Sequence, residues 1–430
     1  MSGTPLRSIF DRNRAGERVG VTSVCCAHPL VIRAALALAR YRGQVAVIES
    51  TCNQVNQDGG YTGLTPQAFA DQVRAAARDI GLPAAMLVLG GDHLGPQPWR
   101  ALPAEAAMAK AVTMVEGYAR AGYTKIHLDC SMACAGDPAA LVDATIAARA
   151  ARLAAAAEAA LPAGAPRPVY VVGTEVPAPG GMGEGHAIVP TDPASVAATW
   201  AAHEAAFAAA RLSDAFARVV AIVVQPGLDF GNEEVVHFAP DAARALADAV
   251  LPLGRAVYEA HSTDYQLPGA YAALVHMHFA ILKVGPAATF ALREAIYALD
   301  LAARELPGWT PAMAVRDAME AAMLRDPAHW QSHYGGDEAR RAYLRHFGYS
   351  DRLRYYWTDP AVEAATAALF GAMDTLPLPL VGQYFPQHLA TVAEGTLAAT
   401  PEALCAASVQ HALAPYADAC GLHAAVGAAG

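Results

Sequence analysis

Groups of chemically capable side chains recur along the first 285 residues, and each group follows a short apolar run. They are CCAH at 25–28, ESTCNQ at 49–54, GDH at 91–93, DCS at 129–131, GTE at 173–175, QPG at 225–227, EAHSTD at 259–264 and KVG at 283–285. Polar groups beside apolar segments are costly to bury unless they are paired or bind a ligand. Because every group shares this placement, the pattern predicts one common site rather than several unrelated structural pairs.

His93, Glu175 and His261 are the members of these groups that suit a divalent metal ion. Two imidazoles and one carboxylate leave positions for a substrate, which is typical of catalytic rather than structural metal sites. No local HxxH-type spacing joins the three, so the prediction depends on their segments converging in space. Asp92, beside His93, either moves a proton near the metal or accepts a hydrogen bond from a histidine ring.

Lys283 supports a different chemistry. It is one of three lysines, with Lys110 and Lys125. A buried lysine at a strand end can form a Schiff base with a sugar carbonyl. It can equally contact a substrate phosphate, or form a structural ion pair with Glu175 or Glu259. The completeness of the metal-ligand set favours the metal-dependent chemistry over the Schiff base.

The segments that position these groups alternate between apolar runs and helical stretches. The predicted strands are Val19–Val24, Gln44–Ile48, Ala85–Leu89, Lys125–Leu128, Pro168–Val172, Val219–Val224, Ala256–Tyr258 and Phe279–Lys283. Continuous apolar strands are typical of a parallel sheet that is covered on both faces. Eight β-then-α units in about 265 residues predict a TIM (β/α)8 barrel, whose functional groups gather at the carboxyl ends of the strands. A doubly wound open sheet is the alternative, but no G-x-G-x-x-G follows the first strand.

The pattern changes to helices alone from Phe290 onward. The predicted helices are Phe290–Glu305, Pro311–Met323, Asp337–Phe347, Pro360–Met373 and Pro401–Leu413, and several begin with proline. We therefore expect a barrel over residues 1–290 that carries the site. A helical extension over 291–430 should pack on it and contribute to substrate closure and oligomer contacts.

Composition narrows the class of protein. The 430 residues carry a formal charge of -10, which disfavours a general nucleic-acid binder. No run of about 20 uncharged apolar residues is present, so no membrane span is expected. The first 18 residues lack the apolar core of a signal peptide, and the seven cysteines form no disulfide framework. A cytoplasmic location is the expectation.

Longer blocks of the sequence resemble the large "Z" subunit family of D-tagatose-1,6-bisphosphate aldolase, within the class II metal-dependent aldolases. The blocks are AHPLV at 27–31, TCNQVNQDGGYTG at 51–63, LGGDHLGP at 89–96, KIHLDCSM at 125–132, VGTEVPAPGG at 172–181, VVQPG at 223–227, EAHSTDYQ at 259–266, FAILKVGPA at 279–287, WQSHYGG at 330–336 and YSDRLRYYW at 349–357. They cover most of the chain, including the helical extension. The resemblance therefore implies a TIM barrel and a metal-dependent reaction on ketohexose phosphates.

The resemblance also implies roles for individual residues. It makes Asp92 the catalytic acid/base, and His93, Glu175 and His261 the metal ligands. Gln225 stands where the superfamily has another ligand histidine, and its amide oxygen could ligate weakly. Zinc is the metal that family habit implies, while manganese, nickel and cobalt suit the same ligands.

The other polar residues of the groups are predicted to serve catalysis or substrate binding. Glu175 and Asp129 join Asp92 as catalytic candidates, and the predicted substrate contacts are Asn53, Gln54, Ser131, Ser262, Thr263, Asp264, Lys283 and Gly285. Ser262-Thr263-Asp264 and Gly285 replace the superfamily's phosphate-binding turn and a polar substrate residue. His127, inside the fourth strand, is expected at most to contact a ligand residue.

The helical extension offers a further predicted contact with the substrate. Arg352 and Arg354 lie beside aromatic residues and could hold a sugar phosphate bidentately, or pair with acidic neighbours where the two parts meet. His333, Tyr334 and Arg354 are the candidates for closure over the substrate.

Metal-assisted cleavage of C3–C4 of a ketohexose phosphate is the reaction that the residues and the resemblance imply, with Asp92 accepting the C4 hydroxyl proton. Release of both fragments is the aldolase reaction. Re-addition through the other face of the aldehyde interconverts D-tagatose 6-phosphate and D-fructose 6-phosphate. The alternative is a non-catalytic subunit that stabilises a class II aldolase catalytic partner. A homo-oligomer is also expected. A kinase is disfavoured because no G-x-x-x-x-G-K-[ST] loop is present.

Overall fold

Eight parallel strands close into a barrel in the computed structural model, which describes residues 4–173, 188–307 and 313–423. The strands are β1 (Val21–Cys25), β2 (Ala46–Thr51), β3 (Leu87–Leu94), β4 (Lys125–Leu128), β5 (Val169–Gly173), β6 (Val219–Val224), β9 (Val257–Ala260) and β10 (Ile281–Val284). Their order around the barrel is β1-β10-β9-β6-β5-β4-β3-β2. The predicted TIM barrel is confirmed.

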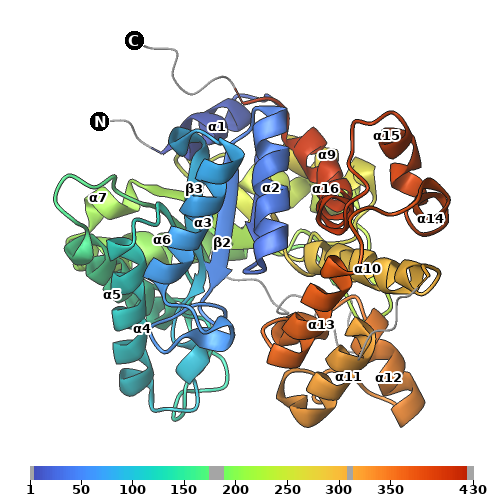
Figure 1. Ribbon diagram of the computed structural model, residues 1–430. Helices are drawn as coiled ribbons and strands as arrows, with labels where there is room; N and C mark the ends of the chain where they lie inside the picture. The colour runs from blue at the N-terminus through green and yellow to red at the C-terminus, as the bar shows by residue number, and fades with distance from the viewer. Residues whose placement is uncertain (1–3, 174–187, 308–312, 424–430) are drawn as a thin grey trace.

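Helices cover the outside of the barrel (Figure 1). They are α1 (Pro5–Arg14), α2 (Pro29–Arg42), α3 (Pro66–Ile80), α4 (Ala104–Arg120), α5 (Asp143–Ala160), α6 (Pro193–Ala209), α7 (Ser213–Phe216), α8 (Pro240–Ala249), α9 (Pro268–His276) and α10 (Pro286–Ala303). Side-chain hydrogen bonds cap the amino ends of several helices: the Thr65 side chain accepts from the Ala68 N–H at α3, and the Asp192 side chain accepts from the Ala194 N–H at α6. A short hairpin of β7 (Asp229–Phe230) and β8 (Val235–Val236) follows β6 and was not predicted.

The third strand differs most from its prediction. A 3-10 turn occupies Ala84–Met86, and the strand begins at Leu87 and continues to Leu94, so Asp92 and His93 lie inside it. The pairing of β3 with β4 shifts register between Gly91 and Leu94, and His93 has a φ of 49°. Such bulges redirect side chains beside active sites. Here the bulge lets two consecutive residues, Asp92 and His93, both reach the same cavity.

The remaining helices form the C-terminal extension, in which α11, α12 and α13 lie together beside α10 (Figure 1). They are α11 (Val315–Arg325), α12 (Glu338–Phe347), α13 (Pro360–Gly371), α14 (Leu378–Tyr384), α15 (Leu389–Ala393) and α16 (Pro401–Cys420), with the 3-10 turn η5 (Arg352–Tyr356) between α12 and α13. The predicted start at Pro311 lies outside the described residues. The expected boundary at residue 290 falls inside α10, which starts directly after β10 and extends into the extension.

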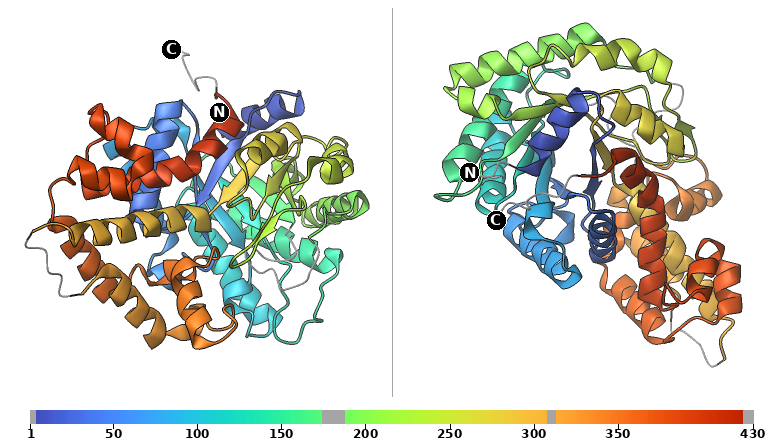
Figure 2. Two further views of the ribbon diagram at one scale, coloured as in Figure 1. Left: turned by 90° about the vertical axis from the view of Figure 1, so that its right-hand side faces the viewer. Right: turned by 90° about the horizontal axis from the view of Figure 1, so that it is seen from above.

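The last helix returns to the barrel. α16 packs against α2, α9, α10 and β1 (Figure 2). The Gly20 N–H donates to the carbonyl of Cys420 at 3.0 Å, and the Val45 N–H donates to Nδ1 of His423 at 2.8 Å. The extension is therefore joined to the barrel at both ends of its sequence. Among the described residues, no helix is both long and apolar enough to cross a bilayer.

Candidate active site

A cavity of about 930 Å³ lies where the carboxyl ends of the barrel strands face the helical extension. The predicted site residues that line it are Asn53, Gln54, Asp92, His93, Asp129, Ser131, His261, Ser262, Asp264, Lys283, Gly285 and Arg354. Gln225, Thr263, His333 and Tyr334 do not line it. Glu175 lies outside the described residues.

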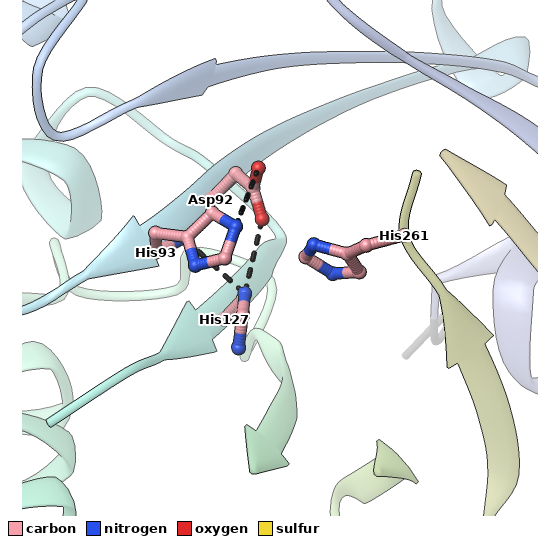
Figure 3. A group of neighbouring side chains, drawn as sticks. All are labelled: Asp92, His93, His127 and His261. Atoms are coloured by element: carbon pink, nitrogen blue, oxygen red, sulfur yellow. Dashed lines mark hydrogen bonds and ion pairs between the residues drawn. The ribbon is translucent and has the colours of Figure 1, made fainter. Parts of the chain in front are cut away.

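Three histidines and one aspartate meet beside this cavity (Figure 3): Asp92, His93 and His261 line it, and His127 is buried next to them. Asp92, His93, His127 and His261 each offer one ligand atom, and these four atoms all lie within 4.8 Å of one another. The ring centroids of His93 and His261 are 4.7 Å apart, close enough for one ion to reach both. Figure 3 shows the rings of His93 on β3, His127 on β4 and His261 just after β9 around a common space.

His93 is oriented by the residue that follows β4. Its Nδ1 lies 2.9 Å from Oδ2 of Asp129, and the Oγ of Ser131 donates to the other carboxylate oxygen of Asp129 at 2.6 Å. Burial opposes a charge on the imidazole, but Asp92 and Asp129 raise the pKa of His93. A carboxylate on Nδ1 leaves Nε2 as the ligand atom, which is the usual arrangement behind a metal-bound histidine.

The environment of His127 supplies an independent test of whether the site fits a cation. Nε2 lies 2.9 Å from the carbonyl of Gly173, so this nitrogen must donate. The backbone N–H of His93 donates to Nδ1, whose lone pair therefore also faces Oδ1 of Asp92 at 3.0 Å. Two acceptors at that distance repel unless a cation or a proton lies between them. A proton on Nδ1 makes His127 a donor to Asp92, whereas a divalent ion in its place would be shared with Asp92, His93 and His261, whose ligand atoms lie together.

Asp92 is held as a carboxylate by cations and donors around it. Burial would raise the pKa of Asp92, but Lys283, His93 and His127 hold it well below its ordinary value. Nζ of Lys283 lies 2.7 Å from Oδ2 of Asp92, and the Cys25 thiol lies 3.4 Å from the same oxygen. An ionised carboxylate beside an ion site can accept a proton from a bound hydroxyl.

A chain of buried ion pairs connects Asp92 to His261 through the barrel interior. Lys283 bridges Asp92 and Glu49. Lys125, which is fully buried, lies 2.6 Å from both Glu49 and Glu259. Glu259 lies 2.9 Å from Nε2 of His261. Gly90 makes room for this chain, because a Cβ there would lie 2.2 Å from the Glu49 carboxylate.

The same ion pairs bear on the Schiff-base alternative. Burial would lower the pKa of Lys283, but Asp92 and Glu49 raise it well above its ordinary value. A nucleophilic lysine requires the opposite shift. The structural partners of Lys283 are Glu49 and Asp92, where the sequence predicted Glu175 or Glu259.

Three other predicted residues, Gln225, Thr263 and Asp264, form hydrogen bonds with backbone groups. Oε1 of Gln225 accepts from the N–H groups of Gly227 and Leu228 at 2.8 and 3.0 Å, so this oxygen closes the turn after β6. The hydroxyl of Thr263 donates to the carbonyl of Lys283. Oδ1 of Asp264 accepts from the N–H of Gly285 at 3.1 Å and from that of Ala287 at 2.8 Å.

The extension contributes η5 to the cavity, with Arg352 and Arg354 on its lining. Arg354 donates to the hydroxyl of Tyr355 and to the carbonyl of Asp351, each at 3.0 Å. His333 and Tyr334 contact Arg352 instead of the cavity: Nδ1 of His333 lies 3.0 Å from the guanidinium, and the Tyr334 hydroxyl accepts from the Arg352 N–H. Burial and the neighbouring arginines lower the pKa of His333 to about 4. Both residues therefore position Arg352.

Lys125 was not predicted at the site, and His127 was predicted at most to contact a ligand residue. Both share a signal with Asp129. The three occupy alternate positions along and just beyond β4, and strand residues two apart point to the same face. All three side chains contact the cluster described above. The alternation of His127 with Asp129 indicates that both point inward, and the same spacing extended back to Lys125 predicts an inward position for that residue too.

Known proteins provide a further comparison. A family described as "D-tagatose-1,6-bisphosphate aldolase subunit GatZ/KbaZ-like" matches residues 6–421. A D-tagatose 6-phosphate 4-epimerase of Agrobacterium fabrum is 49% identical over 98% of each chain. A D-tagatose-1,6-bisphosphate aldolase subunit GatZ of Salmonella dublin is 44% identical over 96% of this chain and 99% of its own. A solved structure titled as a probable tagatose 6 phosphate kinase from Sinorhizobium meliloti has a TM-score of 0.87 and 47% identity, over 93% of this chain and all of that one.

Proposed function

The chain belongs to the GatZ/KbaZ-like family of D-tagatose-1,6-bisphosphate aldolase subunits, and from this premise we propose that it is a metal-dependent C4 epimerase of ketohexose phosphates. The reaction breaks and re-forms the C3–C4 bond and interconverts D-tagatose 6-phosphate and D-fructose 6-phosphate. The observation that carries the proposal is the meeting of Asp92, His93, His127 and His261, three of which (Asp92, His93 and His261) line the cavity.

The metal would be held by His93, His127 and His261, with Glu175 as a further predicted ligand. When bound, it would polarise the C2 carbonyl and neighbouring hydroxyl of the ketose and stabilise the negative charge that develops there. Zinc is expected, and manganese, nickel or cobalt suit the same nitrogen and oxygen ligands.

The side chains of this protein account for the proton transfers. Asp92 accepts the C4 hydroxyl proton, and the electron pair of the C3–C4 bond moves toward C3 and C2, which leaves an aldehyde at C4. After the aldehyde turns, the pair returns to its other face, and Asp92 gives the proton back to the new C4 oxygen. Lys283 and Cys25 keep the Asp92 carboxylate in place throughout.

The wall opposite the barrel supports epimerisation over cleavage. Arg352, Trp357 and Phe370 of the extension line the same cavity as Asp92 and Lys283. Groups on both sides can hold the two fragments while the aldehyde turns. Release of the fragments would make the same site an aldolase.

A second candidate is a stabilising subunit without turnover, since a GatZ subunit is among the relatives. Buried ionic networks are costly to assemble and are not needed for a scaffold. Failure of the pure chain to convert either sugar phosphate, with turnover only when an aldolase catalytic subunit is added, would favour this candidate. A homo-oligomer and a cytoplasmic location remain predictions.

The test is an NMR assay of C4 inversion on both hexulose 6-phosphates with the pure chain. Chelator treatment should abolish turnover and added Zn²⁺, Mn²⁺, Ni²⁺ or Co²⁺ should restore it, because the developing charge then regains its stabilisation. Borohydride with substrate serves as the control for a Schiff base. Inversion that persists after complete metal removal, or covalent trapping at Lys283, would contradict the proposal.

A further inference from the structure

The loops after the seventh and eighth strands are where TIM barrels frequently bind phosphate, at the amino end of a helix. In this protein those loops follow β9 and β10, and the 18-residue helix α10 begins there at Pro286. Gly285 and Pro286 line the cavity. The exposed N–H groups and the dipole of such a helix end attract an anion.

An anion of the protein itself already occupies this helix end. Asp264 is 3% exposed, and its Oδ1 accepts from the N–H groups of Gly285 and Ala287. The N–H groups of Ala288 and Thr289 bond to the carbonyl of Gly285, and Pro286 has none. Every N–H of the first turn is therefore used, and a ligand phosphate would meet a carboxylate in place of donors.

Away from this helix end, the lysine and arginine side chains of the cavity that lack a carboxylate partner among the described residues lie on η5. The lysines and arginines on its lining are Lys283, Arg352 and Arg354. Lys283 is neutralised by Asp92 and Glu49. Neither arginine forms an ion pair with a residue that the structure describes, and the undescribed segments contain no lysine or arginine. Apart from the candidate metal site, which the sugar oxygens would occupy, the cationic side chains of the lining can match one anion, at η5.

We propose that Asp264 is a specificity-determining residue, whose carboxylate fills the anion position of the barrel so that the site accepts a ketohexose with one phosphate and rejects a bisphosphate. Arg352 and Arg354 would then recognise the single phosphate. The sugar class rests on the proposed function, whereas the count of phosphates rests on Asp264 and the arginines. A site of this kind would take the 6-phosphate in the name of the Agrobacterium relative and reject the 1,6-bisphosphate in the name of the Salmonella relative.

Equilibrium binding tests the inference. Calorimetry at pH 8 compares the dissociation constants of fructose 6-phosphate and fructose 1,6-bisphosphate for the full chain. In the wild type, the bisphosphate should bind at least about tenfold more weakly, because like charges brought together are strongly disfavoured. Asp264→Asn keeps an acceptor oxygen for the helix end and removes the charge, so the ratio should fall about tenfold or more. Asp264→Ser serves if the first variant fails to fold.

Glu363→Gln is the matched control, because Glu363 also lines the cavity but lies on α13, away from the start of α10. It should leave the ratio unchanged. Equal binding of both sugars by the wild type, or an unchanged ratio in folded Asp264 variants, overturns the role of Asp264. A shifted ratio without epimerisation upholds that role and overturns the proposed function. Absence of binding of either sugar overturns both.

Discussion

Asp92 combines two properties that are rarely found together, burial and a stable negative charge. It is 1% exposed, and Lys283 holds its carboxylate from one side while the Cys25 thiol lies near the same oxygen. Both neighbours are protonated, because burial raises the pKa of Cys25 and the carboxylates raise that of Lys283. The side chain is therefore prepared to act as a base before the substrate arrives.

Replacing Asp92 with Asn should lower kcat by about 10²–10⁴-fold, the range for loss of a general acid–base group. The KM should change little, because the amide keeps the size of the side chain. Initial rates by the C4-inversion assay provide the measurement. Cys25→Ser, which keeps a hydrogen-bond donor, is the control and should lose much less. Asp92→Asn with undiminished kcat would remove Asp92 from the mechanism.

Asp264 gives a pH-dependent contribution to stability. Burial raises the pKa of Asp264 from 3.8 to about 6, although the Ala287 and Gly285 N–H groups and Arg354 oppose the rise. The folded protein therefore binds this proton more tightly than the unfolded chain. The stabilisation that this bound proton gives to the folded state is fully present below about pH 4 and is lost as the pH rises through 6.

The variant Asp264→Asn should accordingly gain stability relative to wild type between pH 4.5 and 7.5, since it has no charge to bury. Thermal unfolding of both proteins across this range is the measurement. For Glu363→Gln, a change at an exposed residue of α13, the difference in unfolding temperature from wild type should not vary with pH. A wild type whose stability rises relative to that of the Asp264→Asn variant as the pH increases would contradict the assignment.

The strands act as a unit through the ion pairs that join them. Glu49 on β2, Lys125 on β4, Glu259 on β9 and Lys283 on β10 have no more than 5% of their surface exposed. Removing one member leaves a charge without compensation in the barrel interior. This cost is much larger than that of losing a surface pair.

Lys125→Met should therefore destabilise the protein by about 3–5 kcal/mol, the range for breaking a buried ion pair. Lys110→Met breaks the exposed pair with Asp58 and should cost less than about 1 kcal/mol. Urea unfolding of the three proteins measures both. Similar losses of unfolding free energy in the two variants would show that the barrel tolerates Glu49 and Glu259 without the positive charge of Lys125.

Sequence reasoning succeeded for elements whose signal is local. Apolar runs such as Val219–Val224 located the strands to within a few residues, and reactive residues at their ends located the cavity. It failed where a role depends on a partner distant in the chain. The position of Gln225 after a strand indicates a possible ligand, but its oxygen bonds to the backbone of its own turn. His127 joins the cluster through Asp92 and through the backbone N–H of His93, which lies where β3 shifts register.

At the scale of the whole molecule, the extension completes the cavity that the barrel begins. Arg354 comes from η5, about 70 residues beyond β10, yet lines the same space as Lys283. Its predicted role as a phosphate contact stays a proposal. Its neighbours Tyr355 and Asp351 hold the guanidinium in place.

Arg354→Ala should raise the KM for phosphorylated ketohexoses far more than for the free sugars, because a charge-assisted contact to phosphate is lost. Steady-state kinetics with tagatose 6-phosphate and free tagatose measure this difference. Arg340→Ala, which removes a surface arginine paired with Glu233, is the control. An equal rise of KM for both sugars would point to a general packing effect of Arg354.

The attachment of the final residues to the start of the barrel has a consequence for synthesis. His423 accepts from the backbone of Val45 and donates to the carbonyl of Gly20, and Gln44 donates to Ala417. The segment that secures the first two strands is therefore translated only after the other strands of the barrel and the helices α11 to α15. Until then, the nascent chain lacks the hydrogen bonds of Ala417 and His423 to the start of the barrel, and its exposed apolar surface must be protected from aggregation.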